Sequence, residues 1–213
     1  MDYLLEVASY LTKGALVSLS VFLVTILFSF PIGILLAILQ KNNRFLNKVI
    51  SLYTWFFRGT PLMLQLFFFM YGLTFIGINV NRMMVAFIAF IINYSAYFVE
   101  IIRAGIESLP KDQFESAEVM GASKLTMYRY VILPQAIRIQ TPVITNEVIT
   151  LIKDTALVTV IAISDLMRNV KEIVSRDFTV SPFILASAFY LIISFIIVKI
   201  FKQVEKRNDY LET

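Results

Sequence analysis

Long stretches without a charged residue constrain this chain more than any other feature of its sequence. Residues 14–40, 59–81 and 178–198 contain no Asp, Glu, Lys or Arg. About 20 apolar residues in a helix cross the roughly 30 Å hydrocarbon core of a bilayer, so each run is long enough to do so. Only 16% of all residues are charged, against about 25% in an ordinary soluble domain. The sequence therefore predicts an all-α membrane protein.

Two further segments bring the expected number of transmembrane helices to five. Residues 83–99 are uncharged, and residues 139–164 are interrupted only by Glu147 and by the pair Lys153 and Asp154. We expect a single domain over residues 1–213, with helices at about residues 14–40, 49–76, 83–105, 135–164 and 179–201. The first run lacks a basic start and a small-residue cleavage site, which favours a retained helix over a signal peptide. A polar loop at about residues 107–134 separates the third helix from the fourth.

The distribution of basic residues predicts the orientation in the membrane. With the N-terminus outside, twelve Lys or Arg residues fall in cytoplasmic segments and five in external ones. The cytoplasmic set is Lys41, Arg44, Lys48, Arg103, Lys111, Lys124, Arg129, Arg138, Lys199, Lys202, Lys206 and Arg207, and the external set is Lys13, Arg82, Arg168, Lys171 and Arg176. Cytoplasmic loops are enriched in Lys and Arg. We therefore expect an external N-terminus and a cytoplasmic C-terminus. We attribute the net charge of +4 to the orientation of the chain in the membrane, and we expect no nucleic-acid partner.

Several kinds of chemistry are absent from the sequence. The chain has no histidine and no cysteine, so it lacks the commonest metal ligand and the commonest general base. No metal site is expected, and an intramembrane enzyme is a remote reading. Gly72 and Gly77 have the spacing of a phosphate-binding loop, but Ile78 stands where that motif requires Lys. The chain is therefore not expected to bind ATP or another cofactor itself.

The external segment of residues 165–181 allows two interpretations. Leu166, Val170, Ile173 and Val174 recur at roughly helical spacing among charged residues. That pattern is typical of an amphipathic helix lying on the outer membrane surface. A solvated connector explains the composition equally well.

The polar loop carries signals for two short helices. Asp112 and Glu115 have the spacing of a capping box at a helix start. Gly121 either ends this helix or lets another backbone approach closely. Ser123 is placed to cap a second helix over residues 124–133, which Pro134 must end or kink. Such a capped hairpin either docks a partner or merely connects two membrane helices.

The same segment resembles the cytoplasmic loop of permease subunits of bacterial ABC importers, written E-A-A, three residues, G, nine residues, I-x-L-P. The chain departs from this pattern at Ser116 and Val131. Segments 57–61, 65–68, 93–97, 100–106, 132–136 and 151–155 also resemble the polar amino acid branch of that family, although Ala156 stands where Ser is frequent. The positions that match the loop pattern are Glu115, Ala117, Gly121, Leu133 and Pro134.

The resemblance implies a type I ABC importer permease in a bacterial cytoplasmic membrane. Its loop would form a coupling helix in a groove of the ATPase subunit, with the five matching residues as coupling residues. Two ATPase copies would bind ATP and magnesium, and a second permease subunit, identical or related, would complete the pathway through the membrane lipid. An extracytoplasmic solute-binding protein would deliver the amino acid.

Polar residues inside the apolar helices are candidates for the solute pathway, because a charge at the bilayer centre costs several kcal/mol. Asp154, Glu100 and Asn93 are suited to an ammonium group, and Lys153 or Arg58 to a carboxylate. Tyr97 shares a helix face with Asn93, four residues earlier. Arg58 is also placed to hold a helix break before Pro61. Structural roles explain these residues about equally well: Glu100 with Arg103 as an i, i+3 ion pair, Arg58 by snorkelling or by pairing with a neighbouring helix, and the others as pairs between helices.

An ion-gradient-driven secondary transporter or channel is the alternative function, with the same charges acting as a coupling relay. The ordered polar loop argues against it, since such a protein needs no ATPase dock. The mixed charges do not choose among basic, acidic, amide and sulfur-containing amino acids.

Overall fold

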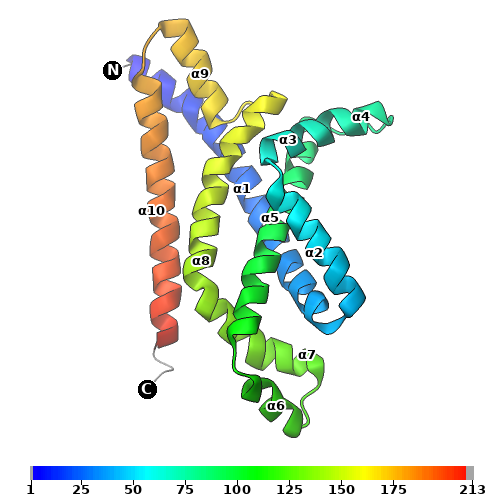
Figure 1. Ribbon diagram of the computed structural model, residues 1–213. Coiled ribbons are helices and arrows are strands. Elements are labelled where there is room, and N and C mark those ends of the chain that lie inside the picture. The colour runs from blue at the N-terminus through cyan, green and yellow to red at the C-terminus, as the bar shows by residue number, and fades with distance from the viewer. Residues whose placement is uncertain (1, 210–213) are drawn as a thin grey trace.

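The structure is a computed structural model that describes the backbone of residues 2–209 and the side chains of residues 6–203. The side chains of Lys206 and Arg207, counted above for orientation, lie outside the described residues. Within the described part every element is helical (Figure 1). In chain order these are α1 (Asp2–Asn42), α2 (Arg44–Gly59), α3 (Leu62–Phe67), a π-helical turn (Phe68–Gly72), α4 (Leu73–Phe75), α5 (Arg82–Ser108), α6 (Lys111–Val119), α7 (Lys124–Met127), a second π-helical turn (Tyr128–Ile132), α8 (Leu133–Asp154), a 3-10 segment (Thr155–Ile161), α9 (Leu166–Asp177) and α10 (Ser181–Asp209).

Among the described residues, three helices are long and apolar enough to cross a membrane: Glu6–Asn42 in α1, Arg82–Ser108 in α5 and Ser181–Gln203 in α10. Leu62–Phe75 is a shorter apolar helical stretch. The all-helical class is confirmed, and five spans remain a prediction. The fourth expected segment, residues 135–164, is not one continuous α-helix. Helix α8 ends at Asp154, and the tighter 3-10 segment follows.

Helix α5 is the centre of the bundle and contacts α1, α2, α3 and α8. Its side chains Phe90, Phe98 and Ile102 are fully buried. Two glycines permit close crossings on this helix. A Cβ at Gly33 of α1 would lie 2.5 Å from the Cβ of Phe98, and a Cβ at Gly105 of α5 would lie 2.7 Å from the carbonyl oxygen of Ala136. Small residues at such crossings let helix backbones approach in membrane proteins.

The expected segment 49–76 begins earlier, at Arg44, and is broken at Thr60. Thr60 is extended (φ −113°, ψ 143°) because the residue before a proline is disfavoured in the α region. The break leaves helix carbonyls without partners, and side chains supply them. Gln65 Nε2 donates to the carbonyls of Phe57 (2.9 Å) and Thr60 (3.1 Å), and Asn93 Nδ2 donates to that of Phe57 (2.9 Å). These amides, rather than Arg58, donate to the carbonyls at the break.

In the polar loop, α6 begins after Pro110 and has no side-chain cap. The predicted capping box is therefore wrong, because Asp112 already lies in the first turn of α6, where its charge favours the helix N-terminus. The prediction that Gly121 ends this helix is correct. Gly121 has φ +75°, and its N–H donates to the carbonyl of Glu118 (2.9 Å), while Ala122 N–H donates to that of Ala117 (3.0 Å). This is the Schellman pattern that ends a helix.

The second loop helix is shorter than expected. Ser123 Oγ accepts from Thr126 N–H (3.2 Å), as predicted for a cap. However, α7 ends at Met127, and the π-helical turn leads directly into α8, with Pro134 in its first turn. The chain thus stays helical through Pro134. A proline has no N–H and its ring clashes with the carbonyl four residues earlier, and the wider π-helical turn accommodates both.

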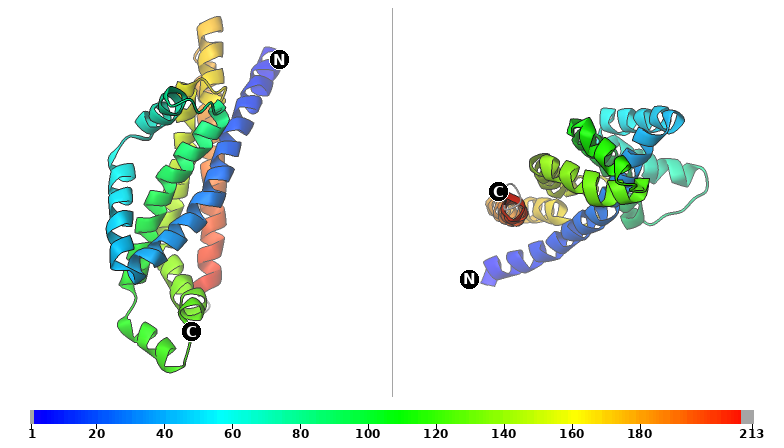
Figure 2. Two further views of the ribbon diagram at one scale, coloured as in Figure 1. Left: turned by 90° about the vertical axis from the view of Figure 1, so that its right-hand side faces the viewer. Right: turned by 90° about the horizontal axis from the view of Figure 1, so that it is seen from below.

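The segment that we expect to be external forms a helix, α9, capped by Asp165, whose carboxylate accepts from Met167 N–H (3.0 Å) and Arg168 N–H (3.1 Å). Its apolar residues are buried against α1 and α10. The amphipathic prediction is correct in form, but the apolar face packs within the protein. The N-terminus, α9 and α4 lie at one end of the bundle, whereas α6, α7, the α1–α2 connection and the end of α10 lie at the other (Figures 1 and 2).

Candidate functional site

A polar cavity of about 370 Å³ lies where the break between α2 and α3 faces α5 and α8. The break exposes a non-helical backbone, and α5 and α8 supply polar side chains. Irregular backbone at membrane depth is tolerated where it lines a cavity or is buried in protein. The lining residues are Arg58, Gly59, Thr60, Pro61, Leu62, Asn93, Tyr94, Tyr97, Glu147, Thr150, Asp154 and Leu157.

Two carboxylates reach the cavity from α8. Glu147 and Asp154 are seven residues apart, so they share a face of the helix. Both are partly buried. Tyr94 of α5 donates its hydroxyl to Asp154 Oδ2 at 2.7 Å, which fixes that carboxylate and leaves its other oxygen for a ligand. The α8 wall of the cavity is therefore acidic.

One cation lines the same cavity from the opposite wall. Arg58 lies in the last turn of α2, and its side chain is 42% exposed. Its guanidinium carbon is 5.3 Å from the centre of the Tyr97 ring, which is cation–π range. Such stacking orients the guanidinium plane without using its N–H donors, so these stay available for a carboxylate.

Asn93 also reaches the cavity but is committed to the fold. It is 4% exposed, and its Nδ2 donates to Gln65 Oε1 (3.0 Å) as well as to the carbonyl of Phe57. The structural reading of Asn93 is therefore the one that its contacts support.

Glu100 lies in a second, separate cavity of about 400 Å³, lined by Gln40, Asn47, Ser51, Thr54, Trp55, Arg58, Glu100, Arg103 and Glu107. Arg103 binds Glu100 Oε2 through Nη2 (2.6 Å) and Nε (3.1 Å), and Thr54 donates to Glu100 Oε1 (2.9 Å). The i, i+3 pair expected from the sequence is thus present. Arg58 Nη1 is 3.8 Å from Glu100 Oε2.

The structure brings together four of the six predicted pathway residues: Arg58, Asn93, Tyr97 and Asp154. Glu100 lies in the other cavity, which it shares with Arg58 but not with Asn93, Tyr97 or Asp154. Lys153 is exposed and lines neither cavity. Lys153 turns away because adjacent helical residues point about 100° apart.

Sequence reasoning missed Tyr94, Glu147 and Thr150 as lining residues. The spacing of Glu147, Thr150 and Asp154 at i, i+3 and i+7 was a usable signal, since it marks one helix face. Tyr94 had no such signal, because its role depends on where α8 packs.

The loop residues fall into exposed and buried sets. Glu115, Gly121 and Pro134 are exposed, Leu133 is half-buried, and Ala117 is buried against the main core of its own chain. Three apolar side chains at the loop tip were not singled out from the sequence. Val119 is 89% exposed, Met120 87% and Leu125 76%. An apolar tip on an otherwise polar loop is typical of a protein-binding surface.

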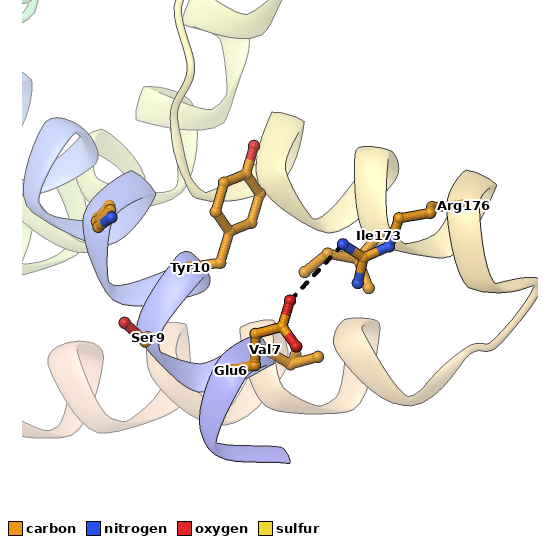
Figure 3. A pocket seen from close by; sticks show the side chains of 7 residues that line it. Glu6, Val7, Ser9, Tyr10, Ile173 and Arg176 are labelled. Carbon is orange, nitrogen blue, oxygen red and sulfur yellow. Dashed lines mark ion pairs between the residues drawn. The ribbon is translucent and has the colours of Figure 1, made fainter. Parts of the chain in front are cut away.

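A third cavity, of about 240 Å³, lies at the end of the bundle opposite α6 and α7, between the first turns of α1 and the last turns of α9 (Figure 3). Arg176 of α9 and Glu6 of α1 approach to 3.9 Å there. Tyr10 donates to Glu172 Oε2 (2.6 Å). These contacts fasten α9 to α1.

Comparisons with known proteins agree on one family. The profile of the family described as "Binding-protein-dependent transport system inner membrane component" matches residues 29–210. A putative glutamine transport system permease protein of Rickettsia conorii is 36% identical over 201 residues, which is 93% of this chain and 92% of that protein. An arginine transport system permease protein of Bacillus subtilis is 34% identical over 201 residues, with the same coverage of 93% and 92%.

A solved structure is similar along nearly the whole chain. It is described as the crystal structure of an amino acid ABC transporter with histidines, with a TM-score of 0.85 and 31% identity. The similarity covers 96% of this chain and 97% of that one. The similarity therefore extends over the whole bundle, including the helices α2, α3, α5 and α8 that line the polar cavity.

Proposed function

Because this chain belongs to the binding-protein-dependent transport system inner membrane component family, we propose that its polar cavity holds the amino acid during transport. The chain is a permease subunit of a polar amino acid ABC importer and a multi-pass protein of the cytoplasmic membrane. It is not itself an enzyme. Membership of this family favours ATP-driven import over the ion-gradient alternative.

The proposed complex contains the chain, a second permease subunit, two ATPase subunits and an extracytoplasmic solute-binding protein. The ATPase subunits bind ATP and magnesium, and their cycle reaches this chain through α6 and α7. The exposed apolar tip at Val119, Met120 and Leu125 supports this docking site. We also propose that the chain crosses the membrane five times, with an external N-terminus and a cytoplasmic C-terminus. The solute-binding protein then meets the end of the bundle that carries α9 (Figure 1).

One observation carries the proposal for the solute: a single cavity places Arg58 opposite Glu147 and Asp154. An amino acid is a zwitterion, so its carboxylate needs a cation and its ammonium an anion. Arg58 offers the guanidinium that binds carboxylates in bidentate geometry. Asp154, oriented by Tyr94, meets the ammonium. In a site shielded from bulk water these pairings gain strength over those in solution.

The cavity has one carboxylate more than a neutral amino acid requires. After Asp154 has met the ammonium, Glu147 is left for the side chain of the solute. A cationic side chain neutralises Glu147, whereas an amide side chain can only donate a hydrogen bond. The charges therefore favour a basic amino acid.

The test is binding of radiolabelled arginine and glutamine to the purified permease–ATPase complex without the solute-binding protein. Glu147→Gln is expected to weaken arginine binding about 10- to 100-fold, the range for losing a hydrogen bond to a charged group, and to affect glutamine less. Glu107→Gln removes a carboxylate outside this cavity and serves as the matched control. Equal losses for both solutes would contradict the charge argument. ATP-independent uptake that follows the membrane potential would contradict the ATP-driven function.

A further inference from the structure

We propose that Arg58 is a latch between the two polar cavities and that the carboxylate of the bound amino acid releases it from Glu100. The proposal rests on the solute site proposed above and adds a step to it. In the solute-free state Arg58 leans toward Glu100. In the loaded state its guanidinium turns to the solute carboxylate, and its contact with Glu100 is lost.

Arg58 is the residue that the linings of the two cavities share. On one side its guanidinium lies over the ring of Tyr97, within the cavity that holds Asp154. On the other side its Nη1 lies 3.8 Å from Glu100 Oε2, within the cavity that holds Arg103. A change in the direction of this one side chain therefore alters both cavities.

The contact of Arg58 with Glu100 is the weakest that Glu100 makes. Arg103 reaches the same oxygen at 2.6 Å and Thr54 donates to the other oxygen at 2.9 Å. These two partners already compensate the buried carboxylate, so the departure of Arg58 does not leave it unpaired. A second cation on a carboxylate that is already satisfied is held loosely.

A solute carboxylate is a better partner for Arg58 than Glu100 is. A free carboxylate takes the guanidinium in two parallel hydrogen bonds of about 2.7–2.9 Å, which are shorter than the 3.8 Å approach to Glu100. The side chain has room to turn, because it is 42% exposed.

The release is local and does not require α2 to leave α5. The hydroxyl of Tyr53 donates to the carbonyl of Ile92 (2.5 Å), and Thr54 stays bound to Glu100. These contacts lie within two turns of Arg58 on the same helix and do not involve its guanidinium. The structure therefore assigns the movement to a side chain rather than to a helix.

The proposal is tested by comparing arginine with agmatine, which is arginine without its carboxylate, as ligands of the purified permease–ATPase complex. Glu100→Gln removes the competitor for Arg58 and keeps an acceptor for Thr54. Arginine affinity is expected to rise about two- to fivefold, the range of a partly exposed ion pair, and agmatine affinity to stay unchanged. Glu107→Gln makes the same charge change in the same cavity, at a partner of Arg103 (2.7 Å) and not of Arg58, and should produce a smaller difference between the two ligands than Glu100→Gln does.

Two further variants make the outcome decisive. Arg58→Gln should weaken arginine more than agmatine and abolish the gain from Glu100→Gln. Arg103→Lys loosens the bidentate hold on Glu100, strengthens its hold on Arg58 and should lower arginine affinity, which tests the latch even if Glu100→Gln does not fold. An unchanged or lower arginine affinity in folded Glu100→Gln, or equal shifts for both ligands, would overturn the latch while leaving the solute site intact. A wild-type complex that imports arginine but shows no loss of affinity on Arg58→Gln would overturn both.

Discussion

The amide of Asn93 shows how a polar side chain inside a membrane protein can serve the backbone. It donates to the carbonyl of Phe57 and to Gln65 Oε1, and thereby satisfies groups that the break in the helix leaves exposed. Asn93→Ala is expected to lower the free energy of unfolding by about 1–3 kcal/mol, the cost of a buried polar group left without its partner. Thermal unfolding in detergent, with and without arginine, measures it.

The exposed Asn146 on α8 is the matched control for Asn93, and Asn146→Ala should leave the unfolding temperature unchanged. Loss of solute binding by Asn93→Ala with wild-type stability would instead assign Asn93 to the solute.

Gly121 makes a second prediction at the scale of one residue. No atom lies within 4 Å of a Cβ at this position, so its constraint is the φ of +75° and not space. Gly121→Ala is expected to cost about 1–2 kcal/mol, the penalty of the left-handed region for a residue with a Cβ, and Gly121→Asn less. Co-purification of the ATPase subunit measures the effect, with retention in the order Gly, Asn, Ala. Equal retention of all three would show that the Schellman turn does not position the loop.

At the scale of helices, close crossings depend on two glycines of the core. Gly33→Ala and Gly105→Ala would each place a Cβ less than 3 Å from a neighbouring chain segment. We expect each to lower the free energy of unfolding by about 1–3 kcal/mol, as overpacking does. Gly72→Ala is the control, since its Cβ meets only the ring of Phe68 at 3.8 Å. Unfolding in detergent measures all three, and equal stability of the variants would contradict the tight crossings.

Helices were predictable from the sequence where a long apolar run dominates, as in α5 and α10. Loop detail was predictable where one residue type has one strong role, as for Gly121 and Ser123. The capping box failed because Pro110 starts α6 earlier than the Asp112 pattern suggests. A proline that precedes a helix supplies a fixed φ for its start, and that signal was overlooked.

At the scale of the whole molecule, the bundle has two ends that carry different elements (Figures 1 and 2). Since the chain has no cysteine, single cysteines report which end faces which side. Ser175→Cys on α9 should react with a membrane-impermeant thiol reagent in intact spheroplasts, and Gln203→Cys on α10 only after lysis. Both side chains are exposed. The reverse pattern would contradict the orientation expected from the positive-inside rule.

The candidate site shows what one sequence leaves open at this scale. The sequence predicted the residue types of the proposed zwitterion site, and Arg58 and Asp154 do share a cavity. The partners of Arg58 and Asp154 in this cavity were not predicted, because Glu147 and Tyr94 join the site only through the packing of α5 against α8. That Glu100 and Asp154 line different cavities could not be foreseen, since it depends on the same packing. The sign of a charge can be read from the sequence, whereas the residues that surround it depend on the tertiary structure.

The π-helical turn at Tyr128–Ile132 has a consequence for how this loop tolerates insertion and deletion. Such a turn contains one residue more than the α-helical turn it replaces. Because both kinds of turn complete one revolution, removing a single residue there would restore an α-helical turn and leave α7 and α8 in nearly the same relative direction. Removing a residue from a regular α-helix instead rotates everything on one side of it by about 100°. The loop is therefore expected to keep its aim after the loss of one residue at this turn and to lose it after the same deletion within α8.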